Sequence, residues 1–161
     1  MLLENTSLTD SLADALRREI IAGDISPDQK LSELWVAERF DVARPTAKAS
    51  LDRLVSEGLL RRGRHKSAFV PRLSAADIED IYLSREPIEA LSVRILAADR
   101  VVPAGADRAL TLMTVAANLG HHAEHTEADV ALHRALVAAT GSLRLRRMHE
   151  AVMGESQLCI A

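Results

Sequence analysis

Basic side chains are concentrated in one part of this sequence, between Ala43 and Arg72. The stretch holds eight lysines and arginines against two acidic residues, a net charge of +6, whereas the whole chain of 161 residues carries −3. A cluster of cations inside an acidic protein is typical of a surface that binds the phosphates of a nucleic acid. Ordinary solvated charge explains any one of these residues, but it explains the cluster less well.

A second candidate for chemistry is the pair Asp129 and His133. The two residues are four apart and therefore share one face of a helix, where a carboxylate and an imidazole can bind the same divalent ion. Two ligands leave such a site incomplete, because zinc sites use three or four. The other interpretation is a simple ion pair or hydrogen bond. His121, His122 and His125 are expected in a loop just before this helix, as polar loop residues without fixed geometry.

Motifs of catalysis are absent from the sequence, which has no glycine-rich phosphate loop, nucleophile elbow or paired zinc-binding cysteines. The sequence therefore predicts a protein that is not an enzyme. Cys159 is the only cysteine, which excludes an internal disulfide and fits a reducing cytoplasm. No apolar run is long enough to span a bilayer, and no basic start of a secretory signal is present, so a soluble cytoplasmic protein without membrane contact is expected.

The basic stretch overlaps a predicted helix-turn-helix. The turn is Asp41-Val42-Ala43, and the second helix is expected to begin near Arg44, with Pro45 in its first turn, and to end at Gly58. Two helices joined this closely cross at a steep angle. Apolar residues at helical spacing mark the two helices, namely Leu31, Leu34, Val36, Ala37 and Phe40, and then Ala47, Leu51, Leu54 and Val55.

A β-hairpin is predicted after the second helix. Leu59-Leu60 and the segment 67–70 are its two apolar ends, and the basic tip between them contains glycine. A hairpin after a helix-turn-helix is a wing that contacts phosphates or the minor groove, while the start of the second helix enters the major groove. The predicted DNA contacts are Arg44, Thr46 and Lys48 on the helix and Arg62, Arg64, His65 and Lys66 on the wing.

Composition places a domain boundary near Arg72. Residues 1–72 carry a net charge of +1 and residues 73–161 a net charge of −4. The first part begins with a helix that is expected to be capped by Thr9 or Asp10. Together with the helix-turn-helix and the wing, this gives three helices and a small β-hairpin. The second part is predicted as a partial antiparallel helical bundle, which makes the fold mainly α. Its helices are expected from Ser74 with a kink at Pro87, at 106–119, at 124–140, and from Ser142 onward.

These segments resemble the GntR family of bacterial transcription regulators. The resemblance rests on Leu31-Ser32-Glu33, Val36-Ala37-Glu38, residues 40–44, 51–54 and 57–60, and Ala68-Phe69-Val70. Residues 81–89 and 129–136, with 138–142 following, resemble the helical FCD domain of the family's FadR branch. The resemblance implies a homodimeric repressor that binds double-stranded operator DNA and responds to a small metabolite such as a carboxylate.

The resemblance also implies a metal ion (zinc, nickel or manganese). In that family the positions of Asp129 and His133 are metal ligands, completed by two histidines of later helices that this chain lacks. Residues 1–72 would then be the DNA-binding domain, and residues 73–161 a partial effector-binding and dimerisation domain. Uncovered apolar faces in this partial bundle predict a homodimer or higher assembly.

Other functions remain open at this point. Leu34, Pro45 and Ser67 depart from the family's usual contact pattern, which fits a ligand- or metal-binding dimerisation module with weak DNA binding. A ligand-blind protein that pairs with a full-length relative is a further alternative. A metallohydrolase built on Asp129, His133 and the loop histidines is the least supported, because no third fixed ligand or general base can be named.

Overall fold

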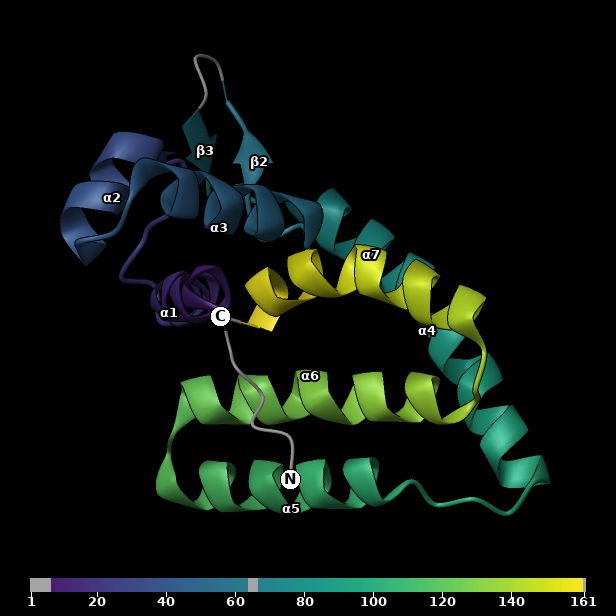
Figure 1. Cartoon of the computed structure of the whole chain (residues 1–161). Helices are drawn as coiled ribbons and strands as arrows, with labels where there is room; N and C mark the ends of the chain where they lie inside the picture. Colours follow the sequence, from purple (N-terminus) through teal and green to yellow (C-terminus); the bar gives the residue numbers. More distant parts are fainter. Residues whose placement is uncertain (1–6, 64–66, 161) are drawn as a thin grey trace. The chain divides into compact units, whose positions relative to one another are not determined.

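The chain forms two compact units, residues 1–72 and 73–161. The computed structural model describes residues 7–63 and 67–160. In the described parts, the first unit holds helices α1 to α3 and a small sheet, and the second holds helices α4 to α7 (Figure 1). The predicted fold class, mainly α with an N-terminal winged helix-turn-helix, is confirmed.

Helix α1 (Leu8–Ile21) is capped by Ser7. The Ser7 hydroxyl accepts a hydrogen bond from the backbone N–H of Asp10 at 3.2 Å, and the Asp10 carboxylate accepts one from the backbone N–H of Ser7 at 3.3 Å. This reciprocal pair is a capping box that satisfies two backbone donors. The predicted cap at Thr9 or Asp10 was therefore wrong, because Asp10 closes the helix start from inside the first turn. Leu12, Leu16 and Ile20 form the buried stripe of α1, which packs on α3.

Helices α2 (Glu33–Phe40) and α3 (Arg44–Ser56) form the helix-turn-helix. The Ser32 hydroxyl caps α2 by accepting a hydrogen bond from the backbone N–H of Trp35 at 3.1 Å. Asp41 ends α2 in the left-handed region with φ 50°, a conformation that aspartate tolerates better than most residues. This residue reverses the chain within a short turn. The predicted start of α3 at Arg44 is confirmed, with Pro45 in the first turn, where the proline's missing N–H leaves no hydrogen bond unmade.

The sheet contains one strand more than the predicted hairpin. Strands β1 (Lys30–Ser32), β2 (Arg61–Arg62) and β3 (Ser67–Phe69) are antiparallel in the order β1-β3-β2. Leu31 was predicted in the helix that follows, but it lies in β1 opposite Ala68 and is fully buried. The predicted strand residues Leu59-Leu60 precede β2 and belong to the core. Strand β1 contacts α2 and pairs with β3, so it attaches the wing strands β2 and β3 to the helices of the same unit.

The second unit is helical throughout its described residues. Helix α4 (Ala75–Ala98) begins at the predicted cap, where the Ser74 hydroxyl accepts a hydrogen bond from the backbone N–H of Asp77 at 3.2 Å. The helix continues through Pro87, which has no N–H to donate to the preceding turn. Its length brings residues of its middle turns against two other helices of the unit, α6 and α7.

Helices α5 (Ala104–Leu119), α6 (His122–Ala139) and α7 (Leu143–Ile160) complete this unit. Helices α5 and α6 lie antiparallel and side by side, and α7 packs on both α4 and α6 (Figure 1). Helices α5 and α6 each begin two residues before their predicted starts. Helix α7 begins one residue after the predicted start at Ser142, whose hydroxyl accepts a hydrogen bond of 3.3 Å from the backbone N–H of Leu145. Among the described residues, no helix is both long and apolar enough to cross a membrane.

Candidate functional site

The first candidate site is the exposed face of α3 at its N-terminal half. Arg44 and Lys48 are one helical turn apart and share this face, and both side chains are exposed. Arg44 forms no ion pair with any residue that the structure describes. Ala43 precedes the helix without a side-chain cap, so backbone N–H groups of the first turn point outward without a capping partner. Thr46 is half-buried beside them.

Lys48 and Arg62 share one carboxylate. The Lys48 ammonium lies 2.7 Å from Oδ2 of Asp52, one turn further along α3, and the Arg62 guanidinium on β2 pairs with Oδ1 of the same residue. Asp52 therefore links the helix to the wing strand. The other predicted wing contacts, Arg64, His65 and Lys66, lie outside the described residues.

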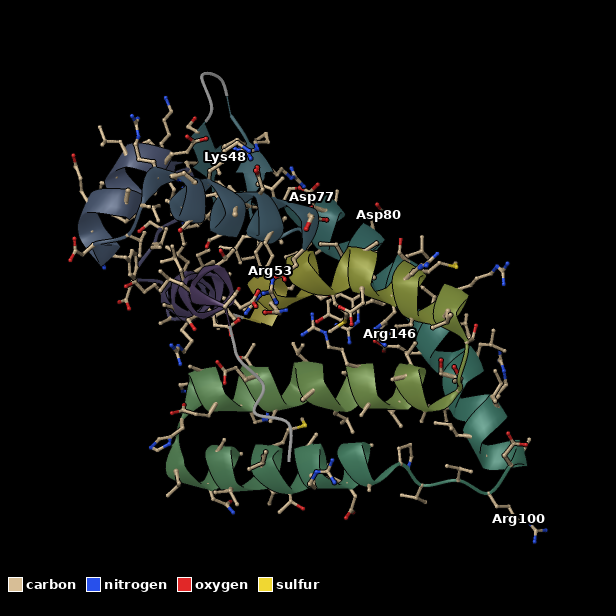
Figure 2. All side chains as sticks on the ribbon, viewed as in Figure 1. Lys48, Arg53, Asp77, Asp80, Arg100 and Arg146 are labelled. Atoms are coloured by element: carbon tan, nitrogen blue, oxygen red, sulfur yellow. The ribbon has the colours of Figure 1, made fainter. Side chains whose placement is uncertain are left out.

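Arg53 belongs to a different face of α3. Its guanidinium donates to Oε1 of Glu57 at 2.8 Å and also pairs with Asp10 of α1. Figure 2 shows Lys48 and Arg53 on opposite sides of α3. Arg53 thus counts among the eight cations of the basic stretch, but it links α3 to α1. Arg17 of α1 pairs with Glu57 as well, which extends this link.

The second candidate site lies in the helical unit and contains the predicted pair. Asp129 and His133 share one face of α6, with Oδ1 of Asp129 3.6 Å from Nε2 of His133. On the other side of the imidazole, Nδ1 of His133 lies 3.0 Å from Oε2 of Glu89 on α4, although the angle does not complete a hydrogen bond. The carboxylates of Asp129 and Glu89 raise the pKa of His133 to about 9. The imidazole is therefore a cation between two anions at neutral pH.

Glu89 joins three helices at this site. Its Oε1 accepts a hydrogen bond from Nε of Arg85 at 2.9 Å and lies 2.9 Å from Nε2 of His149 on α7. Burial alone would raise the pKa of Glu89, but His133, His149 and Arg85 together hold it well below its ordinary value. Sequence reasoning missed this cluster. Arg85 and Glu89 had a visible signal in their spacing of four, whereas nothing in the spacing pointed to His149.

A cavity of about 650 Å³ opens beside the cluster. Its polar lining residues come from α4 and α6, and they are Tyr82, Arg85, Glu86, Glu89, His125, Asp129 and His133. The Arg85 side chain is only 5% exposed, and its guanidinium lies 5.4 Å from the centre of the Tyr82 ring. The cavity therefore presents one buried cation, one imidazolium and three carboxylates to a small polar ligand.

The prediction that the three clustered histidines all lie in a loop was wrong for two of them. His121 is the residue before α6, His122 is its first residue, and His125 lies in its first turn, where it reaches the cavity. Within the described residues, no group of three or more histidine, cysteine, aspartate or glutamate side chains has the arrangement of a metal site. Asp129 and His133 thus supply two ligands at most, and these residues alone do not fit a complete metal centre.

The chain matches two family models. Residues 8–70 match the model described as bacterial regulatory proteins of the gntR family, and residues 80–160 match the FCD domain. The HTH-type transcriptional repressor GlaR of Escherichia coli (strain K12) is 27% identical over an alignment of 146 residues that covers 84% of this chain and 64% of that protein. The HTH-type transcriptional repressor NagR of Bacillus subtilis (strain 168) is 37% identical over 62 residues.

The match to these curated relatives is partial. YdhC, an uncharacterized HTH-type transcriptional regulator of Bacillus subtilis (strain 168), is 28% identical over 81 residues, half of this chain. The aligned part spans 36% of YdhC, 26% of NagR and 64% of GlaR. The chain therefore covers less than two thirds of the length of each of these relatives.

Two solved structures have the same fold. A protein of Rhodococcus sp. RHA1 assigned as a GntR transcriptional regulator superposes with a TM-score of 0.73 at 26% identity, over 93% of this chain and 72% of that one. McbR/YncC of E. coli superposes with a TM-score of 0.75 at 20% identity, over 96% and 74% of the two chains, and supports the fold alone. With its helix-turn-helix, wing and helical second unit all matched, the chain belongs to the GntR family of transcription regulators, in the branch that carries an FCD domain.

Proposed function

We propose that this protein is a sequence-specific DNA-binding repressor whose α3 reads the major groove of its operator. The observation that carries the proposal is the pair Arg44 and Lys48, exposed on one face of the first half of the recognition helix. The N-terminal residues of a recognition helix are the ones that reach base edges. Family membership supports the same role, because the named relatives are HTH-type repressors and regulators rather than enzymes.

Each predicted contact has a distinct role in this proposal. Arg44 donates two hydrogen bonds to a guanine, and Lys48 meets a base or a phosphate. The uncapped first turn of α3, with Thr46, offers N–H groups to a phosphate. Arg62 and the tip residues Arg64, His65 and Lys66 follow the backbone or the minor groove.

Fluorescence anisotropy tests this function. The wild-type chain is titrated into a labelled duplex from upstream of its own gene and into a scrambled duplex of the same composition, over a salt series. We expect tighter binding to the upstream duplex and a steep fall of both affinities with salt. Equal affinity for both duplexes at every salt concentration would contradict sequence-specific recognition.

A small carboxylate is the proposed effector, bound in the cavity beside Arg85. The buried guanidinium uses its Nε for Glu89 and lines the cavity, and the other N–H donors of an arginine can hold a second carboxylate. A thermal-shift titration with succinate tests this, with dimethyl succinate as the uncharged control. We expect the acid alone to raise the melting temperature. Equal shifts with acid and ester would count against a carboxylate site.

A weakly bound divalent metal ion is proposed at Asp129 and His133, the two ligands that the described residues supply. Zinc, nickel and manganese chlorides are the probes, compared on the wild type and on Asp129→Ala. We expect weak stabilisation by one of the three ions that this substitution removes.

A homodimer is the proposed assembly, as is typical of the family. Leu112, Val115 and Leu119 share one face of α5 and are 60%, 50% and 62% exposed. Exposed apolar side chains in a contiguous row favour association. A dimer places two recognition helices on successive half-sites of a palindromic operator.

The alternative function is a ligand-binding dimerisation module that binds DNA weakly. One observation favours it, namely that Lys48 and Arg62 are both paired with Asp52, which weakens their contribution to phosphate binding. Salt-insensitive or absent DNA binding, together with a carboxylate-induced thermal shift, would select this alternative.

A further inference from the structure

The exposed face of the recognition helix carries one carboxylate in line with its cations. Arg44, Lys48 and Asp52 follow one another at intervals of four on α3 and therefore lie on the same face. Asp52 is 39% exposed on this face, so its charge stands where the phosphates of bound DNA would approach. A carboxylate in such a place repels a polyanion and needs an explanation.

The partners of Asp52 come from two elements of the same unit. Lys48 reaches it from one turn earlier in α3, and Arg62 reaches it from strand β2 of the wing. Each oxygen of the carboxylate pairs with one cation, so a cytosine amino group would have to compete with Lys48 and Arg62 for its lone pairs. Direct base reading by Asp52 is thereby disfavoured, and the residue acts through its two neighbours.

We propose that Asp52 is a specificity-determining residue that weakens binding to arbitrary DNA by holding Lys48 and Arg62 in ion pairs. This inference rests on the proposed DNA-binding function of α3 and the wing. Phosphate contacts supply nearly all of the affinity for non-specific sequences, whereas base contacts supply the preference for an operator. A cation paired with Asp52 contributes less to the phosphate contacts that hold non-specific DNA. Arg44 is unpaired among the described residues, so it retains its full contribution to base contacts.

The ion pairs are partly exposed, which sets the size of the effect. Lys48 is 57% exposed and Arg62 37% exposed, so water and salt screen both pairs. The cations are therefore exchangeable and move to a phosphate where the rest of the interface fits. Where it does not fit, they remain with Asp52. Asp52 thus acts as a local counter-charge that phosphates must displace.

The test measures affinity for scrambled duplex DNA over a salt series by fluorescence anisotropy, for the wild type and for Asp52→Asn. Releasing two cations adds up to about two phosphate contacts, so we expect a salt slope steeper by up to about two and, at low salt, binding on the order of ten-fold tighter. The ratio of upstream to scrambled affinity should fall. Asp52→Glu keeps the charge and should restore a wild-type slope.

Two controls separate the local effect from net charge and from folding. Asp24→Asn removes the same charge from an exposed residue that has no ion pair with the described residues, and it should leave the slope unchanged. The triple variant Asp52→Asn, Lys48→Gln, Arg62→Gln should lose the added affinity, because the released cations are gone. Thermal melting followed by circular dichroism checks that each variant is folded, and Asp52→Ser repeats the test with a second neutral side chain.

The outcomes distinguish this inference from the function on which it rests. If neither Asp52→Asn nor Asp52→Ser changes the slope or affinity on scrambled DNA, or if Asp24→Asn has the same effect, the role of Asp52 is overturned. That result leaves the preference of the wild type for its upstream duplex untouched. Equal wild-type affinity for both duplexes overturns the sequence-specific function instead, while the non-specific salt slopes still decide the role of Asp52.

Discussion

Glu89 is the residue on which the polar cluster of the helical unit depends. It lies on α4 and interacts with His133 on α6 and His149 on α7, so one carboxylate joins three helices. A buried carboxylate is tolerated only where donors replace the water that it loses. Arg85 and His149, which are almost fully buried, supply that replacement. The cluster therefore both stabilises the unit and sets the charge of the cavity.

A pH dependence of stability follows from His133. Its pKa is raised to about 9 in the folded protein by Asp129 and Glu89, against an ordinary value of 6.5. The stabilisation is fully present below the ordinary value and is lost as the pH rises through the folded one. We expect the urea midpoint of the wild type to decrease as the pH rises from 6.5 to about 9, and the midpoint of His133→Gln to decrease less. Unfolding at a series of pH values, followed by circular dichroism, measures both.

The control for this prediction is His122→Gln, because His122 is exposed at the start of α6 and outside the cluster. The urea midpoint of His122→Gln should change with pH in the same way as that of the wild type. A wild-type midpoint that stays constant over this range would contradict the charged state of His133.

At acidic pH the dependence of stability on pH has the opposite sign. The lowered pKa of Glu89 gives stability that is lost as the pH falls below the ordinary pKa of a glutamate.

The sequence could reveal part of this cluster. Asp129 and His133 were identified because a spacing of four on one helix is visible in the chain itself. The contact of Glu89 with His149 joins residues 60 apart in sequence, and only the packing of α4 on α7 brings them together. Long-range pairs of this kind have no periodic signal, so residue spacing alone could not predict them.

At the scale of elements, most helices were predictable from their caps and turns. Ser74, Ser142 and Pro45 lie at helix starts where their side chains satisfy or avoid unpaired backbone groups. Strand β1 was missed because it is three residues long and holds a single buried side chain, Leu31. One apolar residue fits the period of a helix as well as that of a strand. Pairing with β3 decides between them, and that pairing is not local.

The core of the winged helix makes a second prediction. Leu54 of α3 is fully buried, whereas Leu34 of α2 is 47% exposed. Leu54→Ala should lower the free energy of unfolding by about 2–5 kcal/mol, because it removes packed methyl groups and leaves a cavity. Leu34→Ala should change it by less than about 0.5 kcal/mol. Urea unfolding followed by Trp35 fluorescence reports on this unit, since Trp35 is the only tryptophan. Equal losses for both variants would contradict the described core.

At the scale of the whole molecule, the two units differ in charge as they differ in proposed task. Residues 1–72 carry a net charge of +1, and residues 73–161 carry −4. The basic side chains that are proposed to meet DNA lie in the first unit, while the carboxylates of the cavity lie in the second. A net negative charge disfavours contact with a polyanion, which agrees with the proposal that DNA binds to the first unit.

Association through α5 is the prediction at this scale. Sedimentation equilibrium at micromolar concentration should give a dimer for the wild type. The double variant Leu112→Glu, Val115→Glu should give a monomer, because it places charges within the exposed apolar row. Leu143→Glu alters an equally exposed leucine at the start of α7 and should remain a dimer. A monomeric wild type would contradict the proposed assembly.

The most direct test of the central claim compares Arg44→Ala with the wild type on upstream and scrambled duplexes by fluorescence anisotropy. If the start of α3 reads bases, the substitution should cost about 1–3 kcal/mol on the upstream duplex and much less on the scrambled one. The preference between the two duplexes would then collapse. An equal loss on both duplexes would show that Arg44 contacts only phosphate, and it would contradict the account of α3 as the element that reads sequence.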